Sequence, residues 1–296
     1  LYIRGGKIMR KKFLLLWSLL GILVLITACG SNKETVKEYN IDDFLKSYNK
    51  VVNSVEEKTK YWSDSEREES KYTDVIKQYA EKNDLSINQT IQLRGKFAYI
   101  LGTALNLQEE ENSENSFLCF FHASKKSTKV PSEIALLNPG DNIKVEVTIS
   151  PKYNENGKSQ ASIYSDNCKV ITPNLSKVKY KSNTNSVIGD STTSRIMGEV
   201  TSVIENPYSE AERKEISDSV DSSVSGEYEF SSALQYATNI VSLNLDGTDD
   251  KLLCFVNKSY AKLPKTGDKI SLIGSPFTYS NTFGVDANYS PIYIFK

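Results

Sequence analysis

Cysteine and histidine are the residue types in this sequence that could carry nucleophilic or metal chemistry. Beyond the N-terminal region there are three cysteines, Cys119, Cys168 and Cys254, and the chain has one histidine, His122. Cys119 and His122 lie three positions apart on an expected strand, so their side chains point to opposite faces and cannot form a nucleophile–base pair. Zinc sites need several closely spaced Cys or His ligands, which this sequence lacks. We therefore expect no enzyme activity, no metal and no cofactor.

The three cysteines predict structure instead. Cys119 and Cys254 lie in similar apolar runs, Phe117–Phe121 and Leu252–Val256. A small buried thiol is the usual role of cysteine in such a strand. The alternative is a disulfide between Cys119 and Cys168, which would leave one cysteine unpaired.

Aromatic side chains gather near the C-terminus. Aromatic residues that alternate along a strand usually belong to the core, whereas an exposed aromatic face can stack on bases or sugars. We expect core positions, with a binding face as the alternative, for Phe277, Tyr279, Phe283, Tyr289, Tyr293 and Phe295.

The N-terminal region has the pattern of an export signal. Met9–Lys12 is a short basic segment, and Phe13–Ala28 is a run of 16 mostly apolar residues. This run is typical of a signal peptide and is short for a spanning helix, which needs about 20 residues. A signal peptide normally begins with its basic segment. We therefore expect translation to start at Met9 and residues 1–8 to be upstream sequence read as protein.

The apolar run ends in Ile26-Thr27-Ala28-Cys29, which resembles a lipobox, the lipidation signal of bacterial lipoproteins. The resemblance implies cleavage after Ala28, a signal peptide at 9–28 and a diacylglyceryl group on the Cys29 thiol. Two acyl chains hold a protein on a membrane more firmly than one. The expected location is the extracytoplasmic face of the cell membrane, and the abundance of Lys, Asn, Ser and Ile favours a Gram-positive cell. An uncleaved anchor helix is the alternative.

The exported part carries a mild negative charge. The chain has 36 basic and 37 acidic residues, and five of the basic residues but none of the acidic ones precede Cys29. The remainder therefore has 31 basic against 37 acidic residues. Nucleic acids and anionic lipids attract proteins with a surplus of Lys and Arg. Nucleic acid is therefore not the partner we expect.

A helical segment is expected at 41–90, after a polar tether at 29–40. Apolar residues recur at spacings of three and four from Ile41 to Val55, and a shorter stripe of the same kind lies within 66–82. This is the pattern of an amphipathic helix. We expect the apolar stripes to pack on the domain that follows, with a partner-binding surface as the alternative.

From residue 91 the pattern changes to short strands and then repeats. The matching segments are Gly95-Lys96-Phe97 with Gly198-Glu199-Val200, the Cys119 run with the Cys254 run, and Gly140-Asp141 with Gly267-Asp268. The second copy is longer by an insertion at about 207–238. A Ser, Thr, Asn and Lys-rich linker at 173–194 separates the two copies.

Short strands, a small helical turn and a Gly-Asp turn into a strand resemble the OB-fold, a five-stranded Greek-key barrel. Each copy is similar to the tRNA-anti-like group of OB-fold domains found in exported bacterial proteins. The resemblance rests on the apolar-Cys-apolar strand and the Gly-Asp turn, and it covers 91–172 and 195–296. We expect a mainly β chain with an N-terminal helical segment (α+β) and two tandem OB-like small β-barrels. Other small barrels or sandwiches are the alternative.

These features favour a membrane-anchored extracytoplasmic lipoprotein that acts as a non-enzymatic binding or scaffold module at the cell envelope. The membrane is one partner, through the lipid on Cys29, and a protein or glycan ligand is the other. The alternative is a nucleic-acid-binding OB-fold lipoprotein for DNA uptake or phage exclusion, which the acidic balance disfavours. A carboxylate-dependent hydrolase needs two acids that face each other across a cleft, and the sequence identifies no such pair.

Overall fold

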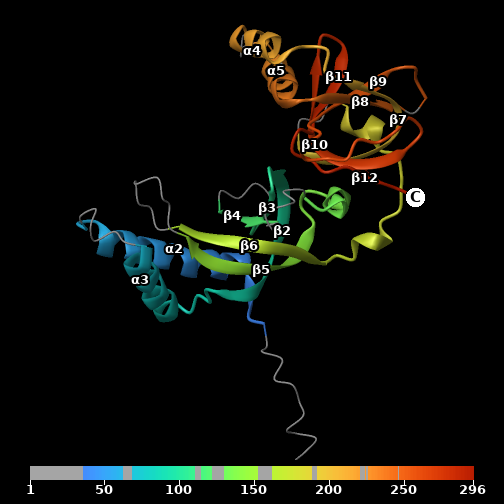
Figure 1. The fold of residues 1–296 in the computed structure, drawn as a ribbon. Helices are drawn as coiled ribbons and strands as arrows, with labels where there is room; N and C mark the ends of the chain where they lie inside the picture. Colours follow the sequence, from blue (N-terminus) through green and yellow to red (C-terminus); the bar gives the residue numbers. More distant parts are fainter. Residues whose placement is uncertain are drawn as a thin grey trace, which may run out of the picture. The chain divides into compact units, whose positions relative to one another are not determined.

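The computed structural model describes residues 36–62, 69–110, 115–121, 130–152, 162–188, 192–220, 224, 226–245 and 247–296. Residues Lys37–Lys296 form a compact unit that contains two β-sheets with helices attached to each (Figure 1). The expected upstream residues, the signal peptide, Ala28 and Cys29 lie outside the described residues. Within the described part, no helix has both the length and the apolar character needed to cross a membrane.

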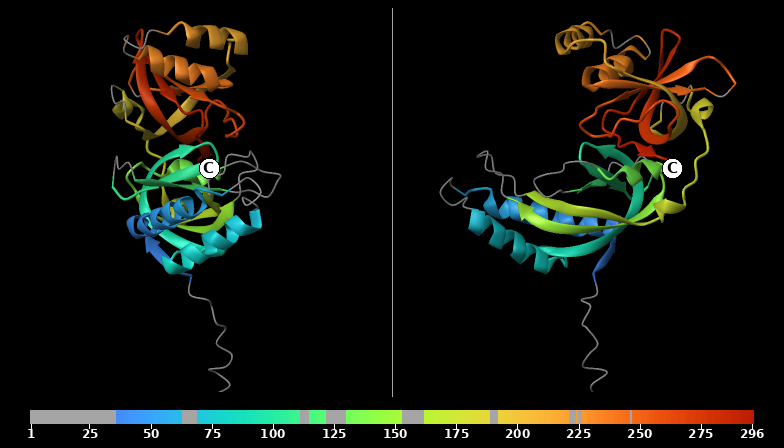
Figure 2. Two further views of the ribbon diagram at one scale, coloured as in Figure 1. Left: turned by 90° about the vertical axis from the view of Figure 1, so that its left-hand side faces the viewer. Right: turned by 45° about the vertical axis from the view of Figure 1, so that its right-hand side comes forward.

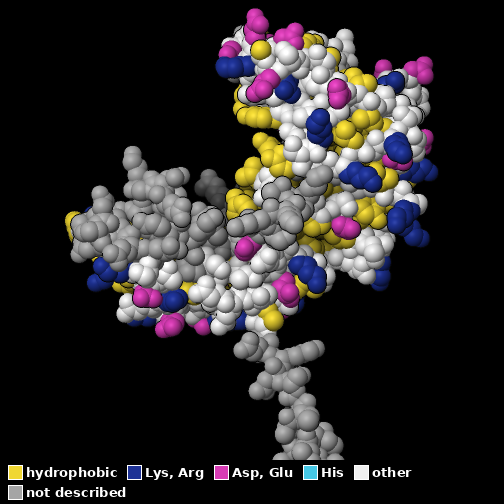
Figure 3. Space-filling view, in the orientation of Figure 1, with side chains coloured by type: hydrophobic (Ala, Val, Ile, Leu, Met, Phe, Trp, Pro, Cys, Tyr) yellow, Lys and Arg dark blue, Asp and Glu magenta, His cyan; other side chains and the backbone are white. Residues whose placement is uncertain are grey.

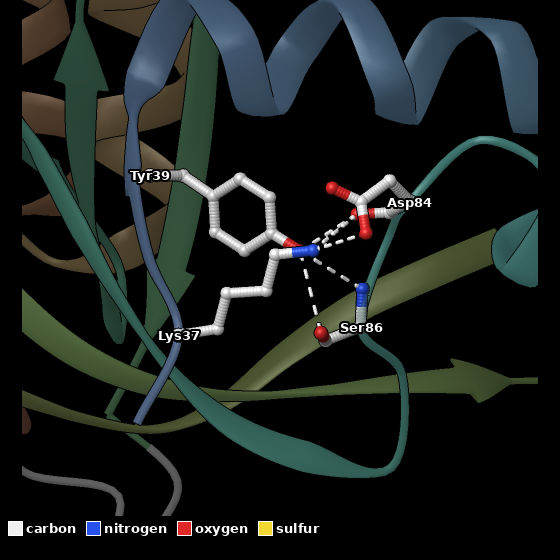
Figure 4. Close-up of polar contacts among 4 residues, drawn as sticks. All are labelled: Lys37, Tyr39, Asp84 and Ser86. Carbon is white, nitrogen blue, oxygen red and sulfur yellow. Dashed lines mark hydrogen bonds and ion pairs between the residues drawn. The ribbon is translucent and has the colours of Figure 1, made fainter. Parts of the chain in front are cut away.

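Residues 38–40 fall at the end of the expected tether, but they form strand β1 (Glu38–Asn40), which pairs in parallel with β2. Figure 4 shows how this strand is fixed. The Tyr39 hydroxyl donates to the backbone oxygen of Asp84 (2.8 Å) and accepts from the backbone N–H of Ser86 (3.1 Å). Lys37 forms an ion pair with the Asp84 carboxylate. These residues therefore belong to the folded domain rather than to the tether.

The helical segment consists of α2 (Ile41–Thr59) and α3 (Glu69–Lys82), which lie beside the first sheet (Figures 1 and 2). The apolar stripe of α2 is buried, with Phe44 and Val51 at 0% exposure. Phe44 packs edge-on against Phe117 of the sheet, with ring centroids 4.8 Å apart. The expected packing of the helices on the following domain is therefore observed for α2.

The first sheet has the order β4-β3-β2-β5-β6, with β1 alongside β2. Its strands are β2 (Gln89–Leu101), β3 (Ala104–Gln108), β4 (Ser116–Phe120), β5 (Asn142–Lys152) and β6 (Ser162–Thr172), and a 3-10 turn, η1 (Ser132–Leu136), precedes β5. The long strand β2 pairs with β5 over 89–96 and with β3 over 96–101. Counted from β2, the fourth strand (β5) thus returns beside the first (β2), which is Greek-key order.

The first sheet is open, because its path ends at β4 and β6 without a backbone ladder between them. One buried side chain connects these two edges. Ser165 of β6 donates from its hydroxyl to the backbone oxygen of Leu118 (2.8 Å) and accepts from the backbone N–H of Phe120 (2.9 Å), both on β4.

The second sheet repeats the strand order and is nearly closed into a ring. Its strands are β7 (Ser194–Glu205), β8 (Asn239–Asn244), β9 (Lys251–Val256), β10 (Lys269–Tyr279), β11 (Thr282–Asp286) and β12 (Tyr293–Ile294). Strand β10 returns beside β7, and β11 pairs both with β10 and, in parallel, with β9. The expected insertion forms α4 (Glu210–Asp218) and α5 (Glu227–Tyr236), which lie together beside this sheet in Figures 1 and 2.

The segments matched in the sequence make the same hydrogen bonds in both domains. Gly140 donates to the backbone oxygen of Phe97 (2.7 Å), and Phe97 donates to that of Asp141 (2.9 Å). The corresponding bonds in the second domain are Gly267 to Val200 (2.8 Å) and Val200 to Asp268 (2.9 Å). Gly140 and Gly267 both have φ of 87°, which favours glycine.

The described part of the expected linker, residues 173–188 and 192–194, is folded against the β domains. It carries two short 3-10 turns, η2 (Leu175–Lys177) and η3 (Thr184–Val187), with Leu175 and Val187 buried. Hydrogen bonds also join the domains directly, from Ser271 Oγ to the backbone oxygen of Ala135 (2.6 Å) and from Arg195 Nη1 to that of Leu136 (2.6 Å). These contacts explain why residues 37–296 form one compact unit.

Candidate functional site

The three cysteines that follow the N-terminal region are all buried free thiols. Cys119 on β4, Cys168 on β6 and Cys254 on β9 are free. Burial, and next a hydrogen bond with Cys168, raises the pKa of Cys119, while burial alone raises the pKa of Cys254. Because the thiolate is the reactive form, Cys119 and Cys254 are poor nucleophiles at neutral pH. Cys119 and Cys168 are adjacent, and the disulfide between them stays a prediction.

Several of the C-terminal aromatic residues are core residues. Phe277 is buried beside Phe255, with ring centroids 5.9 Å apart. Tyr293 and Phe295 contact each other edge-on at 5.1 Å and pack against the larger core cluster. Tyr279 and Phe283 are likewise partly buried and pack against core clusters. Tyr289 is also partly buried, but it contacts other tyrosines and belongs to no core cluster of the described residues.

A recess in the first domain lies where β1, the start of α2 and the sheet meet. We call it the charged recess, with a volume of about 650 Å³. Gly95 and Ile143 line it beside charged side chains of both signs: Asp42, Asp43, Glu109, Arg94 and Lys144. This volume is within the usual range of small-molecule sites, about 300–1,000 Å³.

The positive side of the charged recess is held by an ion-pair network. Arg94 on β2 and Lys144 on β5 are directly paired across the two strands, an arrangement that like charges destabilise. Glu38 of β1 offsets this repulsion, because it forms ion pairs with Arg94 and with Lys144 (2.7 Å to Lys144). The hydrogen bond from Lys144 lowers the pKa of Glu38, so this carboxylate stays ionised.

The negative side of the recess is the first turn of α2. Asp42 and Asp43 lie there, where the helix dipole favours acidic side chains. Asp42 forms an ion pair with Lys46 and accepts a hydrogen bond from it, and this hydrogen bond raises the pKa of Lys46. The recess thus offers hydrogen-bond donors on one side and acceptors on the other, which suits a polar ligand carrying both. Its lining residues include no Cys, Ser or His, so they provide no thiol, serine or imidazole nucleophile.

The surface charge is mixed. On the face shown in Figure 3, Lys and Arg side chains are dispersed among Asp and Glu, and the described residues form no continuous basic groove there. Double-stranded nucleic acid is normally bound through a concentrated basic surface. The dispersed charge agrees with the acidic balance of the sequence.

The residues of the charged recess were not identified from the sequence. Glu38, Arg94 and Lys144 are far apart in the chain and fit no spacing motif. Strand pairing brings them together, because β1 and β5 both pair with β2, one on each side of it. Adjacent polar positions on expected strands were the only available signal, and they do not distinguish a site from a solvated face.

Comparisons with known proteins do not assign a family. No protein-family model matches the chain, and no curated protein sequence matches it. Among solved structures, a murine DNA-binding protein bound to double-stranded DNA is 11% identical, and the match covers 69% of this chain and 98% of that chain. Its TM-score is 0.26, and a likeness this weak carries no argument about fold or function.

Proposed function

We propose that the protein is an exported lipoprotein, anchored by lipid on Cys29, whose β domains bind an envelope ligand without converting it. The observation that carries the binding role is the charged recess of about 650 Å³, lined by Arg94 and Lys144 on one side and Asp42 on the other. The preferred ligand is a protein or glycan segment with both donors and acceptors.

We also propose that each β domain is an OB-like barrel. Both have Greek-key strand order with a long first strand shared between two partners. In the second domain the pairing of β11 with β9 and β10 supports ring closure. In the first domain the Ser165 bridge between β6 and β4 supports the same closure through a side chain.

The anchor is tested by mass spectrometry of the mature N-terminus in membranes of a producing bacterial cell. We expect an acylated Cys29 as the first residue and no Met9–Ala28 peptide. Cys29→Ala should abolish the acyl mass and the membrane fraction. A free, unacylated N-terminus in the unaltered protein contradicts the proposal.

Binding is tested with the mature chain and immobilised cell-wall glycan, with double-stranded DNA as the second arm. Arg94→Ala should weaken glycan binding about tenfold, as expected when a charge-assisted hydrogen bond is lost. Lys169→Ala, an exposed lysine on β6 of the same domain, is the matched control and should leave binding unchanged. Tighter retention of DNA than of glycan would favour the nucleic-acid alternative, and equal effects of the two variants would exclude the charged recess.

A further inference from the structure

A second recess lies where β10, the end of β11 and the segment 287–290 of the other β domain meet residues 99–100 of β2. It has a volume of about 180 Å³ and is distinct from the charged recess. Asp286, Asn288 and Tyr289 provide its principal polar groups, and Tyr99 of β2 also lines it. We call it the Asp286 recess.

Asn288, which lines this recess, has a buried side-chain acceptor without a partner among the described residues. The residue is 1% exposed, and its Nδ2 donates both to the backbone oxygen of Ala233 (2.8 Å) and to Asp286 Oδ1 (2.9 Å). Two acceptors thus fix the amide orientation, because the flipped amide would place its oxygen against both of them. Asn288 Oδ1 is left with no hydrogen-bond donor among the described residues. A buried unpaired carbonyl of this kind costs free energy unless a ligand or solvent donates to it.

The second acceptor is the carboxylate of Asp286. Oδ1 accepts from the backbone N–H and the Nδ2 of Asn288, while Oδ2 has no donor among the described residues. Burial raises the pKa of Asp286, as expected for a carboxylate whose charge is not matched by a nearby cation. The described residues that line the recess include no Lys, Arg or His. Its free polar groups therefore attract a positively charged hydrogen-bond donor.

Tyr289, which lines the recess, belongs to a cluster of three tyrosines. The ring of Tyr289 lies 5.3 Å from that of Tyr260 and 6.3 Å from that of Tyr236. Tyr236 is 47% exposed, so the cluster reaches the surface. Aromatic faces attract organic cations and cover alkyl chains, whereas they offer little to a hydrated metal ion.

The donor set also distinguishes an ammonium group from a divalent metal. Calcium takes six to eight oxygen ligands and usually several carboxylates. Asp286 is the only carboxylate among the described residues that line the recess, and the described residues contain no cluster of three or more His, Cys, Asp or Glu that could hold a metal. A primary ammonium needs only a few acceptors, which Asp286 Oδ2 and Asn288 Oδ1 provide.

We propose that the Asp286 recess binds the primary ammonium end of an unbranched alkyl chain, such as a lysine side chain. The ammonium donates to Asp286 Oδ2 and Asn288 Oδ1, and Tyr289 covers the alkyl stem. This deepens the proposed binding role, since it assigns a ligand class to a second site. The two proposals are separable, because Arg94→Ala changes the charged recess without altering the Asp286 recess.

The test is an NMR titration of the mature chain that follows the Asn288 side-chain NH₂ signal. The probe is butylammonium chloride, and potassium chloride at equal ionic strength is the reference. We expect a saturable shift with a Kd on the order of 1–10 mM, as for other small fragments. Tetramethylammonium carries the charge without an N–H donor and should not produce it. Phosphoethanolamine should bind more weakly, because no basic side chain is present to neutralise its phosphate.

Asp286→Asn should weaken butylammonium binding tenfold or more, through loss of a charge-assisted hydrogen bond. Asp249→Asn, an exposed acid on the β8–β9 loop, is the matched control and should bind as the unaltered chain does. Tyr289→Leu, which keeps apolar bulk, provides a second variant if Asp286→Asn does not fold, and it should weaken binding about threefold. The proposal is overturned by no shift up to 100 mM butylammonium, by an equal shift with potassium, by undiminished binding in folded Asp286→Asn or Tyr289→Leu, or by tighter binding of phosphoethanolamine.

Discussion

The two β domains begin with the same architecture and differ in how the last strand completes it. In the first domain β5 pairs with β2 and β6 along overlapping stretches, so the sheet stays open and β6 reaches β4 through side chains such as Ser165 rather than through backbone pairing. In the second domain β10 pairs with β7 over 269–274 and with β11 over 275–279, and β11 reaches β9 by backbone pairing. The change of partner in β10 falls after Gly274.

Gly274 gives this difference a physical cause. In the shared register Ile143 faces Gly95 and Ile270 faces Gly198, so Gly274 occupies the position of Val147. A Cβ at Gly274 would overlap Val285 Cγ1 and would lie 2.6 Å from the backbone oxygen of Asp286. Absence of a side chain thus lets β11 approach β10 closely. The domain that has glycine at this position is thus the one whose sheet is nearly closed by backbone pairing.

The largest loss of stability should come from a charge placed at the equivalent buried positions of the two domains, Cys119 and Cys254. Cys119 and Cys254 are both 0% exposed and face Leu105 and Val241 on the neighbouring strands. Cys254→Lys or Cys119→Lys should cost about 4 kcal/mol or more of unfolding free energy, because each buries an unpaired charge. Replacement by Ala should cost only about 1–2 kcal/mol. Urea unfolding followed by circular dichroism measures both, and tolerance of lysine at one site alone would break the equivalence.

Oxidation should stabilise only the first domain. With oxidised glutathione as oxidant, Cys119 and Cys168 would each give up one hydrogen, form a disulfide and reduce the glutathione to two thiols. The bond would join β4 to β6, and we expect a gain of about 2–4 kcal/mol from the constrained unfolded chain. Intact mass should show the loss of two hydrogens. Cys168→Ala should remove both the mass change and the stabilisation, and a stabilisation that survives in this variant would refute the pairing.

Filling the backbone contact at Gly274 should disturb the second domain. Gly274→Val introduces the residue of the first domain and should cost about 2–3 kcal/mol through overpacking against β11. Thr278→Val, at an exposed position of the same strand, should change stability by less than about 0.5 kcal/mol. Hydrogen exchange of the β9–β11 amides localises the effect. Unchanged protection of these amides would show that Gly274 does not govern closure.

Removing the Ser165 hydroxyl tests the side-chain contact between β6 and β4 in the first domain. Ser165→Ala leaves the Leu118 oxygen and the Phe120 N–H without this partner, so we expect a loss of about 1–2 kcal/mol. Thr90→Ala, at an exposed strand position in the same domain, is the control for thermal unfolding. Equal behaviour of the two variants would mean that the bridge contributes nothing to the first domain.

The smallest effect concerns pH and belongs to the second domain. Since burial raises the pKa of Asp286 in the folded chain, the folded state holds this proton more tightly than the unfolded state. Stability should therefore fall as pH rises from the unfolded value, about 3.9, through the raised folded value. Asp286→Asn should remove that part of the slope in unfolding measured across this pH range. An unchanged slope would exclude Asp286 as its source.

Sequence and structure agree best where local pattern and backbone geometry coincide. The α2 stripe, the two Gly-Asp turns and the matched cysteine strands were predicted, because each depends on periodicity or on a glycine with positive φ. The strand character of 38–40 was missed, since β1 depends on the distant partners Asp84 and β2. The linker was predicted from amino-acid composition. Composition does not show that Leu175 and Val187 are buried in hydrophobic cores of the folded chain.

By itself the sequence determined an α+β chain with two related β segments, the burial of Cys119 and Cys254, and the expectation of a lipid anchor at Cys29. The tertiary structure alone decided which polar residues meet. Glu38, Arg94 and Lys144 come together through strand pairing, and Asp286 and Asn288 form a recess with Tyr99 of the first domain. The reason is that hydrophobic periodicity encodes which face of an element is buried, whereas contacts between elements depend on register and twist, which no local pattern specifies.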